Sequence, residues 1–283
     1  MQYSALIGDP VEHSVSPTLF YLLADYARIE YSHLKIRVKS KRDLKNTLYQ
    51  LRFLGFCGVN VTLPYKLDII RCLDVISPSA AKIGAVNTVV FRNHTIVGYN
   101  TDAIGALRAI ETKLKKLNKN DKVLILGAGG AARAIVYALY SKTRNIVILN
   151  KNIGEAKKLS LDVSGGKIQV ENLSVKNISV YFKDSNIIVN ATPVGMHPNN
   201  KQEIVSKDIF VKNSARGKYF FDAIFNPYKT NFLINAEKRG GKVCSGMYMM
   251  IFQGIEAFKL WTGVSLKNVN VERINRELIN KIA

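Results

Sequence analysis

The sequence has few of the features that would place the chain in a membrane or outside the cell. Its three cysteines, Cys57, Cys72 and Cys244, form no C-x-x-C pair and show no metal-ligand spacing. No apolar run approaches the roughly 18 residues that are needed to cross a bilayer. The first ten residues resemble a strand and a turn rather than a signal peptide. We therefore expect a cytoplasmic protein with reduced cysteines and no bound metal.

Acidic residues are also scarce, with 21 Asp and Glu against 41 Lys and Arg, which gives a formal net charge of +20. A basic surface can indicate binding to nucleic acid or to acidic membranes. Here the excess is spread along the chain, as +5 in residues 1–100, +8 in 101–200 and +7 in 201–283. The densest basic clusters, at 113–122 and 39–42, lack the interleaved aromatic residues of a nucleic-acid surface. A positive field that attracts anionic small molecules is the favoured interpretation.

Short apolar runs alternate with helical patterns in the first hundred residues. The pattern predicts strands at 2–7, 31–38, 57–61, 85–91 and 96–99. It also predicts a helix with Ser16 as N-cap and Pro17 at the first helical position, and a second helix at 42–54. Strands that alternate with helices indicate an α/β unit with a mainly parallel sheet.

A second α/β unit follows. A helix is predicted at 101–117, then strands at 122–126, 145–149, 168–170, 186–190 and 219–223, and two final helices at 246–261 and 269–282. We predict an N-terminal α/β substrate domain at 1–100, which the C-terminal helices of 240–283 return to and complete. Inserted between them, residues 101–239 are predicted to form a Rossmann-type, doubly wound dinucleotide-binding domain.

The run GAGGAAR at 127–133 lies between a predicted strand and a predicted helix, which is the context of a dinucleotide-binding loop. Gly127 permits the tight turn, Gly129 lets the backbone approach a pyrophosphate, and Ala132 allows close packing of strand and helix. The amide groups at the helix N-terminus favour phosphate. The expected cofactor contacts of this loop are Gly127, Ala128, Gly129, Gly130 and Ala131. A glycine-rich turn without a ligand is the alternative.

The residues after the second strand of this unit bear on the choice of cofactor. NAD enzymes usually carry Asp or Glu about 20 residues beyond the glycines, where it binds the ribose 2′-hydroxyl. This chain has Asn150, Lys151 and Asn152 there. Lys151 can pair with a 2′-phosphate and Arg133 can assist it, so NADP is favoured. The ordinary alternative is that Lys151 is a surface lysine.

Four separate segments of the first domain are rich in polar residues: GDPVEHSVSP at 8–17, GVNVTLPYK at 58–66, GAVNT at 84–88 and GYNTD at 98–102. Several of these residues follow predicted strands, where ligands bind in open α/β sheets. Each residue also has an ordinary explanation. Ser14 and Ser16 can cap a helix, Lys66 can face solvent after a proline turn, and Asp102 can complement a helix dipole. Singly, those explanations would suffice.

Taken together, these segments resemble the shikimate dehydrogenase family along nearly the whole chain. The family patterns G-x-P-x-x-H-S-x-S-P, N-V-T-x-P-x-K, G-A-V-N-T and G-x-N-T-D are matched in the four segments above. The glycine loop, N-A-T-P-x-G-M at 190–196 and G-x-x-M-x-x-x-Q at 246–253 match as well. The resemblance implies NADPH-dependent reduction of 3-dehydroshikimate to shikimate.

The resemblance also implies roles for individual residues. Ser14 and Ser16 are expected to hold the substrate carboxylate. The remaining substrate contacts are expected at Asn60, Thr62, Asn87 and Gln253, and the catalytic pair at Lys66 and Asp102. Further cofactor contacts are expected at Thr192, Met196, Ile224 and Gly246.

The chemistry expected of Lys66 has a basis independent of the family. Negative charge develops on the ketone oxygen as hydride arrives, so a positioned cationic acid both stabilises and protonates that oxygen. Desolvation would bring a lysine pKa toward neutrality, and a neighbouring carboxylate such as Asp102 would oppose that shift.

Three departures from the family pattern lie outside the catalytic pair. Phe225 replaces a tyrosine that commonly precedes Asn-Pro, which removes one hydroxyl, although Tyr228 is near in sequence. Lys151 replaces an arginine, and lysine is a point charge rather than a bidentate fork. Phe20 and Tyr21 replace a His-Asn or His-Gln pair, which we interpret as a packing change.

Two alternatives remain within this interpretation. One is a dual quinate/shikimate dehydrogenase that uses NAD, although relatives accepting quinate tend to replace one carboxylate-binding serine with threonine. The other is a catalytically silent cofactor-binding regulator, although such paralogues typically lose the lysine or the aspartate. A small-molecule substrate is the expected partner, and the chain is expected to be a monomer or a homodimer.

Overall fold

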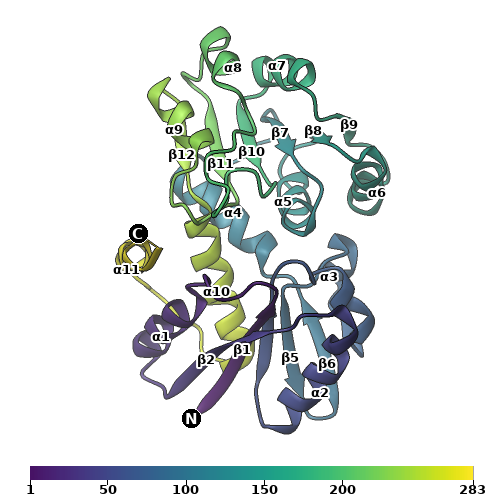
Figure 1. Cartoon of the computed structure of the whole chain (residues 1–283), viewed down its shortest axis with the longest axis vertical. Helices are drawn as coiled ribbons and strands as arrows, with labels where there is room; N and C mark the ends of the chain where they lie inside the picture. Colours follow the sequence, from purple (N-terminus) through teal and green to yellow (C-terminus); the bar gives the residue numbers. More distant parts are fainter. Residues whose placement is uncertain (283) are drawn as a thin grey trace. The chain divides into compact units, whose positions relative to one another are not determined.

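The computed structural model describes residues 1–282 and divides the chain into two compact units. The first comprises Met1–Thr101 and the segment from Ile251 onward, and the second comprises Asp102–Met250. Each unit contains its own six-stranded sheet (Figure 1). The two-domain α/β architecture predicted from the sequence is confirmed.

The sheet of the first unit has the order β2-β1-β3-β5-β6-β4. Its strands are β1 (Gln2–Gly8), β2 (Tyr31–Arg37), β3 (Gly58–Val61), β4 (Val75–Ile76), β5 (Thr88–Arg92) and β6 (Thr95–Tyr99). β1 pairs in parallel with β2 and β3, and β4 pairs in parallel with β6. β5 is antiparallel to both of its neighbours. The sheet is therefore mainly parallel, with one reversed strand next to β3.

The helical elements of the first unit are α1 (Ser16–Ala27), η1 (Lys41–Asp43), α2 (Leu44–Phe53), η2 (Asp68–Cys72), α3 (Pro78–Ile83) and α11 (Val271–Ile282), together with the second part of α10 (Gly246–Thr262). The predicted N-cap at Ser16 is wrong. Val15 occupies that position without a side-chain bond, and Ser16 begins the helix. Its hydroxyl accepts a hydrogen bond from Ser14 instead of closing the helix end.

The second unit has the order β12-β11-β10-β7-β8-β9, and all its neighbouring strands are parallel. The strands are β7 (Lys122–Leu126), β8 (Asn145–Asn150), β9 (Gln169–Asn172), β10 (Ile187–Asn190), β11 (Tyr219–Asp222) and β12 (Lys242–Cys244). The helices are α4 (Asp102–Lys113), α5 (Gly130–Tyr140), α6 (Ile153–Ser164), α7 (Val175–Asp184), α8 (Lys207–Lys212) and α9 (Asn231–Lys238).

The strand order of the second unit reverses between β7 and β10, which is the switch point of a doubly wound sheet. Its core includes a cluster of phenylalanines, in which Phe182 and Phe210 meet edge to face at 5.3 Å and Phe220 and Phe232 at 5.7 Å. Buried aromatic side chains contribute strongly to core stability, so this cluster stabilises the sheet from which the loops extend.

The second boundary between the units falls between Met250 and Ile251, inside α10. From the sequence, the change was expected at residue 240. The difference arises because β12 pairs with β11 and extends the second sheet. A three-residue strand gives almost no periodic signal, and the glycines at 240 and 241 suggested an end to the unit.

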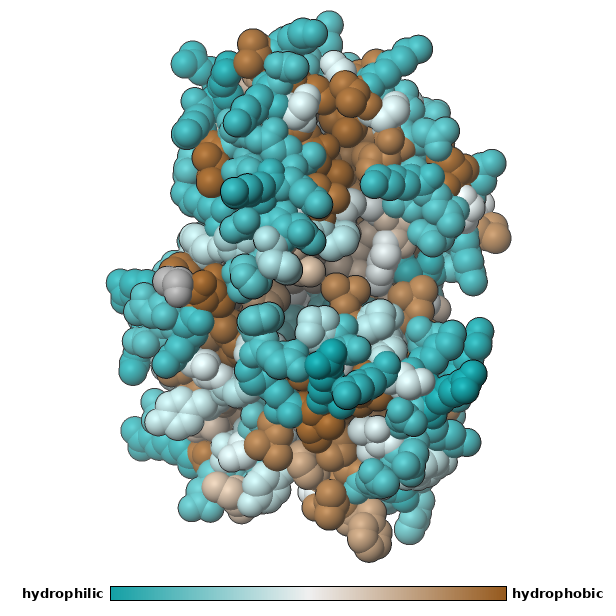
Figure 2. Space-filling view, in the orientation of Figure 1, coloured by the Kyte–Doolittle hydropathy of each residue, from teal (hydrophilic) through white to brown (hydrophobic). Residues whose placement is uncertain are grey.

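Hydrophilic residues cover most of the face seen in Figure 2, with apolar patches between them. In residues 1–282 no helix combines the length and hydropathy that a bilayer crossing requires. All three cysteines have free thiols.

Candidate active site

Backbone hydrogen bonds connect the polar motifs of the first unit to one another. Asp9 N–H donates to Leu63 O at 3.0 Å, which links the first motif to the second. The second and third motifs are joined by the bonds from Val61 N to Asn87 O at 2.8 Å and from Val86 N to Lys66 O at 2.8 Å. Segments far apart in sequence therefore form one continuous polar region of the first unit.

Asn87 is the centre of a buried side-chain network in that region. Its side-chain oxygen Oδ1 accepts from the Thr101 N–H at 2.7 Å. Its amide nitrogen donates to Thr101 Oγ1 at 3.0 Å and to Gln253 Oε1 at 3.2 Å. Asn60 donates to the Asn87 backbone carbonyl at 3.2 Å and to Thr88 Oγ1 at 3.2 Å. Three of the predicted substrate contacts, Asn60, Asn87 and Gln253, thus lie together, and the network orients their amides.

Ser14 and Ser16 also lie together. The Ser14 hydroxyl donates to Ser16 Oγ at 3.0 Å and accepts from the Ser16 N–H at 3.2 Å. The loop is held from β2, where the Lys35 ammonium donates to the carbonyls of Glu12 at 2.6 Å and Ser14 at 3.2 Å. Lys35 adds positive charge beside two hydroxyl donors, an arrangement suited to a carboxylate. Lys35 was not identified from the sequence, because it is one of many exposed basic residues.

The predicted catalytic residues occupy different local environments. Lys66 is half-buried and follows a turn in which the Tyr65 N–H donates to Thr62 O at 3.0 Å. Asp102 is 4% exposed and is the first residue of α4. It directly follows Thr101, which is part of the Asn87 network. Each residue is thus attached through the backbone to the region that contains the predicted substrate contacts.

A second polar cluster in the first unit lies among aromatic side chains. Ser4 Oγ is 2.6 Å from His33 Nδ1 and accepts from the Tyr31 hydroxyl at 2.5 Å. The His33 ring lies 4.2 Å from the ring of Phe20. Burial lowers the pKa of His33 to about 3, because the protonated ring would lose its hydration. Phe20 is therefore a packed core residue, as its departure from the family pattern suggested, whereas Tyr21 is 69% exposed.

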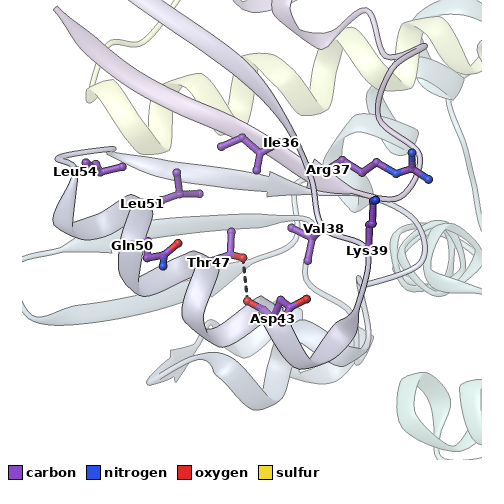
Figure 3. A pocket seen from close by; sticks show the side chains of 9 residues that line it. All are labelled: Ile36, Arg37, Val38, Lys39, Asp43, Thr47, Gln50, Leu51 and Leu54. Carbon is purple, nitrogen blue, oxygen red and sulfur yellow. Dashed lines mark hydrogen bonds between the residues drawn. The ribbon is translucent and has the colours of Figure 1, made fainter.

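One surface hollow of the first unit lies between β2 and α2 and contains none of the predicted site residues (Figure 3). Arg37, Lys39 and Asp43 stand at its edge, and Leu51 and Leu54 contribute apolar atoms. The Thr47 hydroxyl donates to the Asp43 carbonyl one turn earlier, at 2.9 Å. The hollow lacks the convergent polar groups of the Asn87 region.

The glycine loop of the second unit has the geometry that the sequence predicts. Gly127 has a φ of 110°, and a Cβ there would lie 2.9 Å from both Ala191 O and Thr192 Cγ2. Gly129 precedes α5 with extended backbone, and a Cβ on it would meet no atom within 4 Å. The space in front of Gly129 is therefore open to a ligand, while Gly127 is required by the fold. The N-terminal amides of α5 point into this region.

A buried carboxyl joins the two loops that follow β10 and β11. Asp222 accepts from Asn190 Nδ2 at 3.1 Å, from the Ile224 N–H at 3.0 Å and from the Thr230 hydroxyl at 2.6 Å. Burial raises the pKa of Asp222 to about 7, and the three donors oppose that rise. The predicted cofactor residues Thr192 and Ile224 are both attached to this assembly, since Thr192 donates to Asn190 Oδ1 at 2.7 Å.

Two further cofactor predictions fall on or beside these loops. Met196 is held by a turn in which its N–H donates to Pro193 O at 3.1 Å. The Gly246 N–H donates to Ile224 O at 3.1 Å, and a Cβ on Gly246 would lie 2.3 Å from Ala223 O. Glycine is therefore required where α10 begins. Asp222 itself was not identified from the sequence. The signal that could have found it is its position between a buried strand and an Asn-Pro turn.

The turn between β8 and α6 contains the predicted 2′-phosphate residues. Asn150 ends β8, Lys151 is exposed, and Asn152 caps α6 through the Glu155 N–H at 3.3 Å. Arg133 is 4% exposed and forms an ion pair with Asp162 on α6. The structure thus places Arg133 in a link between α5 and α6, and its contact with a phosphate remains a prediction.

Comparison with known proteins extends this description to the whole chain. A family model described as the shikimate dehydrogenase substrate binding domain matches residues 6–89, and one described as shikimate / quinate 5-dehydrogenase matches residues 109–227. A shikimate dehydrogenase (NADP(+)) of Methanococcus vannielii is 40% identical over 263 residues, which cover 91% of this chain and 90% of the relative. The chain belongs to the shikimate dehydrogenase family.

Solved structures of the shikimate dehydrogenase family share the fold of this chain over nearly its full length. A crystal structure of a shikimate dehydrogenase in complex with NADP+ is 34% identical, with a TM-score of 0.90, and covers 100% of this chain and 96% of its own. The enzyme of Thermus thermophilus, in complex with NADP(H) and shikimate, is 31% identical, with a TM-score of 0.85, over 98% of this chain and 100% of its own. The similarity includes both units.

Proposed function

We propose that this protein catalyses the reversible NADPH-dependent reduction of 3-dehydroshikimate to shikimate, in the pathway to chorismate and the aromatic amino acids. The observation that carries the proposal is the buried Asn87 network, which orients the amides of Asn60, Asn87 and Gln253 in the same unit as the Ser14–Ser16 pair and Lys66. Directional donors and acceptors of this kind suit a small polyhydroxy acid. The second unit offers a complementary dinucleotide loop.

The residues of the second unit fit NADP. The open space before Gly129 and the N-terminal amides of α5 suit a pyrophosphate, and Lys151 provides a cation for the 2′-phosphate. We assign the nicotinamide contacts to Thr192, Met196, Ile224 and Gly246, because these residues lie on the loops joined by Asp222 or beside them. NADPH supplies the hydride when bound, and the chain supplies orientation and a proton.

Binding of the substrate is assigned to the first unit. Ser14 and Ser16 bind the carboxylate, with Lys35 adding favourable charge through its position on the Ser14 carbonyl. Thr62, Asn87 and Gln253 bind the ring hydroxyls, and Asn60 maintains the amide network. A site built on such buried amides rejects analogues that leave those groups unpaired.

Lys66 is proposed as the catalytic acid. Its ammonium donates a proton to the ketone oxygen as negative charge develops there, and the reverse transfer applies during oxidation of shikimate. Asp102 orients the ammonium and accepts a hydrogen bond from the adjacent hydroxyl. Proton transfer and charge stabilisation then come from one side chain.

A dual quinate/shikimate activity is less well supported. Both residues of the carboxylate-binding pair are serines, and their two hydroxyls bond to each other. We also propose that the enzyme works in the cytoplasm as a monomer or a homodimer. The three free thiols agree with a reducing compartment.

The deciding experiment follows absorbance at 340 nm with the purified chain in four combinations, shikimate or quinate with NADP+ or NAD+. We expect the largest kcat/KM with shikimate and NADP+. A larger kcat/KM with quinate, or a ratio for NADP+ over NAD+ below about one, would overturn the substrate or cofactor assignment. Absence of activity in all four combinations would favour a silent cofactor-binding protein.

A further inference from the structure

The first turn of α6 places a carboxylate beside the end of β8, where residue 150 is an asparagine. Asn150 Nδ2 donates to Glu155 Oε2 at 3.2 Å and to the Asn152 carbonyl at 2.9 Å. Glu155 is exposed in the first turn of α6, yet its side chain turns back to the last residue of β8. A carboxylate is thereby held one hydrogen bond away from the position where NAD enzymes carry Asp or Glu.

Helix capping does not account for this arrangement. In a capping box, the carboxylate at the third helical position bonds to the backbone N–H of the N-cap residue. Here Asn152 is the N-cap and accepts from the Glu155 N–H at 3.3 Å, while the Glu155 carboxylate bonds to the Asn150 side chain. The bond therefore fixes the carboxylate at the strand end rather than at the cap.

The charges around this turn oppose one another. Lys151 is exposed between Asn150 and Asn152 and favours a 2′-phosphate. The Glu155 carboxylate opposes the same phosphate at short range. Arg133 is only 4% exposed, and its ion pair with Asp162 partly offsets its charge.

We propose that Glu155 is a specificity-determining residue, whose carboxylate limits the preference of this enzyme for NADP and lets NAD bind through its ribose 2′-hydroxyl. The inference rests on the proposed function, because it concerns the cofactor of that reaction. It has a physical basis in two effects. The carboxylate repels the 2′-phosphate of NADP and accepts a hydrogen bond from the 2′-hydroxyl of NAD.

The test measures binding directly. Dissociation constants of NADP+ and NAD+, which differ only in the 2′-phosphate, are determined by titration calorimetry for the wild type and Glu155→Gln. We expect the ratio Kd(NAD+)/Kd(NADP+) to rise about 5- to 30-fold in Glu155→Gln, at low ionic strength, and to rise further in Glu155→Lys. The rise should shrink as salt is added, because exposed charges are screened.

Glu237→Gln is the matched control. It removes the same charge from an exposed glutamate of α9, which packs against β11 and β12, whereas α6 packs against β8 and β9. If Glu155→Gln changes the ratio by less than twofold, or no more than Glu237→Gln does, the inference is wrong. That result would leave the proposed function intact, provided that shikimate is still oxidised. If the wild type oxidised shikimate with neither NADP+ nor NAD+, the proposed function would instead be wrong.

Discussion

The two units build their candidate sites from different parts of the chain. In the first unit, side chains from five segments form the site, because the amide of Asn87 contacts both Thr101 of the fourth motif and Gln253 of α10. In the second unit, much of the site is backbone: the open approach at Gly129, the required glycines 127 and 246, and the amides at the start of α5. A site of buried side chains is sensitive to the loss of any hydrogen-bonding group, whereas a backbone site is sensitive to added atoms.

The largest effect should come from Lys66→Ala. Removal of the proposed acid is expected to lower kcat by about 10²–10⁴-fold, with a smaller change in KM. Stopped-flow measurement of NADPH oxidation with 3-dehydroshikimate separates the two constants. Turnover close to that of the wild type would show that Lys66 is not the catalytic acid.

Asn87→Ala should affect binding and stability together. The change leaves the buried Thr101 N–H without its acceptor, which costs about 1–3 kcal/mol. We expect the KM for shikimate to rise about 10- to 100-fold and Tm to fall by several degrees. Thermal denaturation beside steady-state kinetics provides both values. An unchanged KM would show that Asn87 does not bind the substrate and has only a structural role.

Gly129→Ala tests the backbone site by adding an atom rather than by removing a hydrogen-bonding group. Because a Cβ there meets no atom within 4 Å, Tm should stay within about 1 °C of the wild type, while the Kd for NADP+ rises about tenfold, equivalent to about 1.4 kcal/mol. The control is Gly127→Ala, where φ is 110° and the Cβ would contact Ala191 O. That variant should lose stability as well. Equal losses of Tm in the two variants would contradict the distinction between them.

Asp222→Asn should change the pH dependence of stability. The folded pKa of about 7 lies above the ordinary value of 3.8, so the protonated native carboxyl stabilises the fold at low pH, and this contribution is lost as pH rises toward 7. Asparagine keeps the acceptor for Asn190 and Ile224 without the charge. We expect its Tm relative to wild type to be higher at pH 8 than at pH 5. The same difference at both pH values would show that Asp222 does not titrate as described.

His33→Phe should produce the smallest effect, with the reverse sign. The folded pKa of about 3 lies below the ordinary value of 6.5, so stability is full above pH 6.5 and is lost progressively as pH falls toward 3. The variant should therefore lose less Tm than the wild type between pH 7 and pH 4.5. If Tm fell equally in the two proteins over this pH range, groups other than His33 would be responsible for the acid sensitivity.

The sequence predicted the strand at 122–126 with the same bounds as β7, because a continuous apolar run ended at a glycine loop. It did not single out α3, α6 to α9, β4 or β12, of which α3, α8, β4 and β12 have six residues or fewer. The carboxylate-binding, amide and glycine-loop residues were predicted through motifs. Asp222, Lys35 and Glu155 were not found, because their importance depends on contacts between segments, such as the bond from Lys35 to the Ser14 carbonyl.

The indole N–H of Trp261 donates to the Val89 carbonyl at 2.9 Å, and the side chain is 7% exposed. It is the only tryptophan of the chain. Its intrinsic fluorescence is therefore an optical reporter of the first unit alone: emission should shift to the red when that unit opens, even while far-ultraviolet dichroism still registers an ordered second sheet. Recording both signals during denaturation would reveal which half of the polypeptide melts first, without attaching any label.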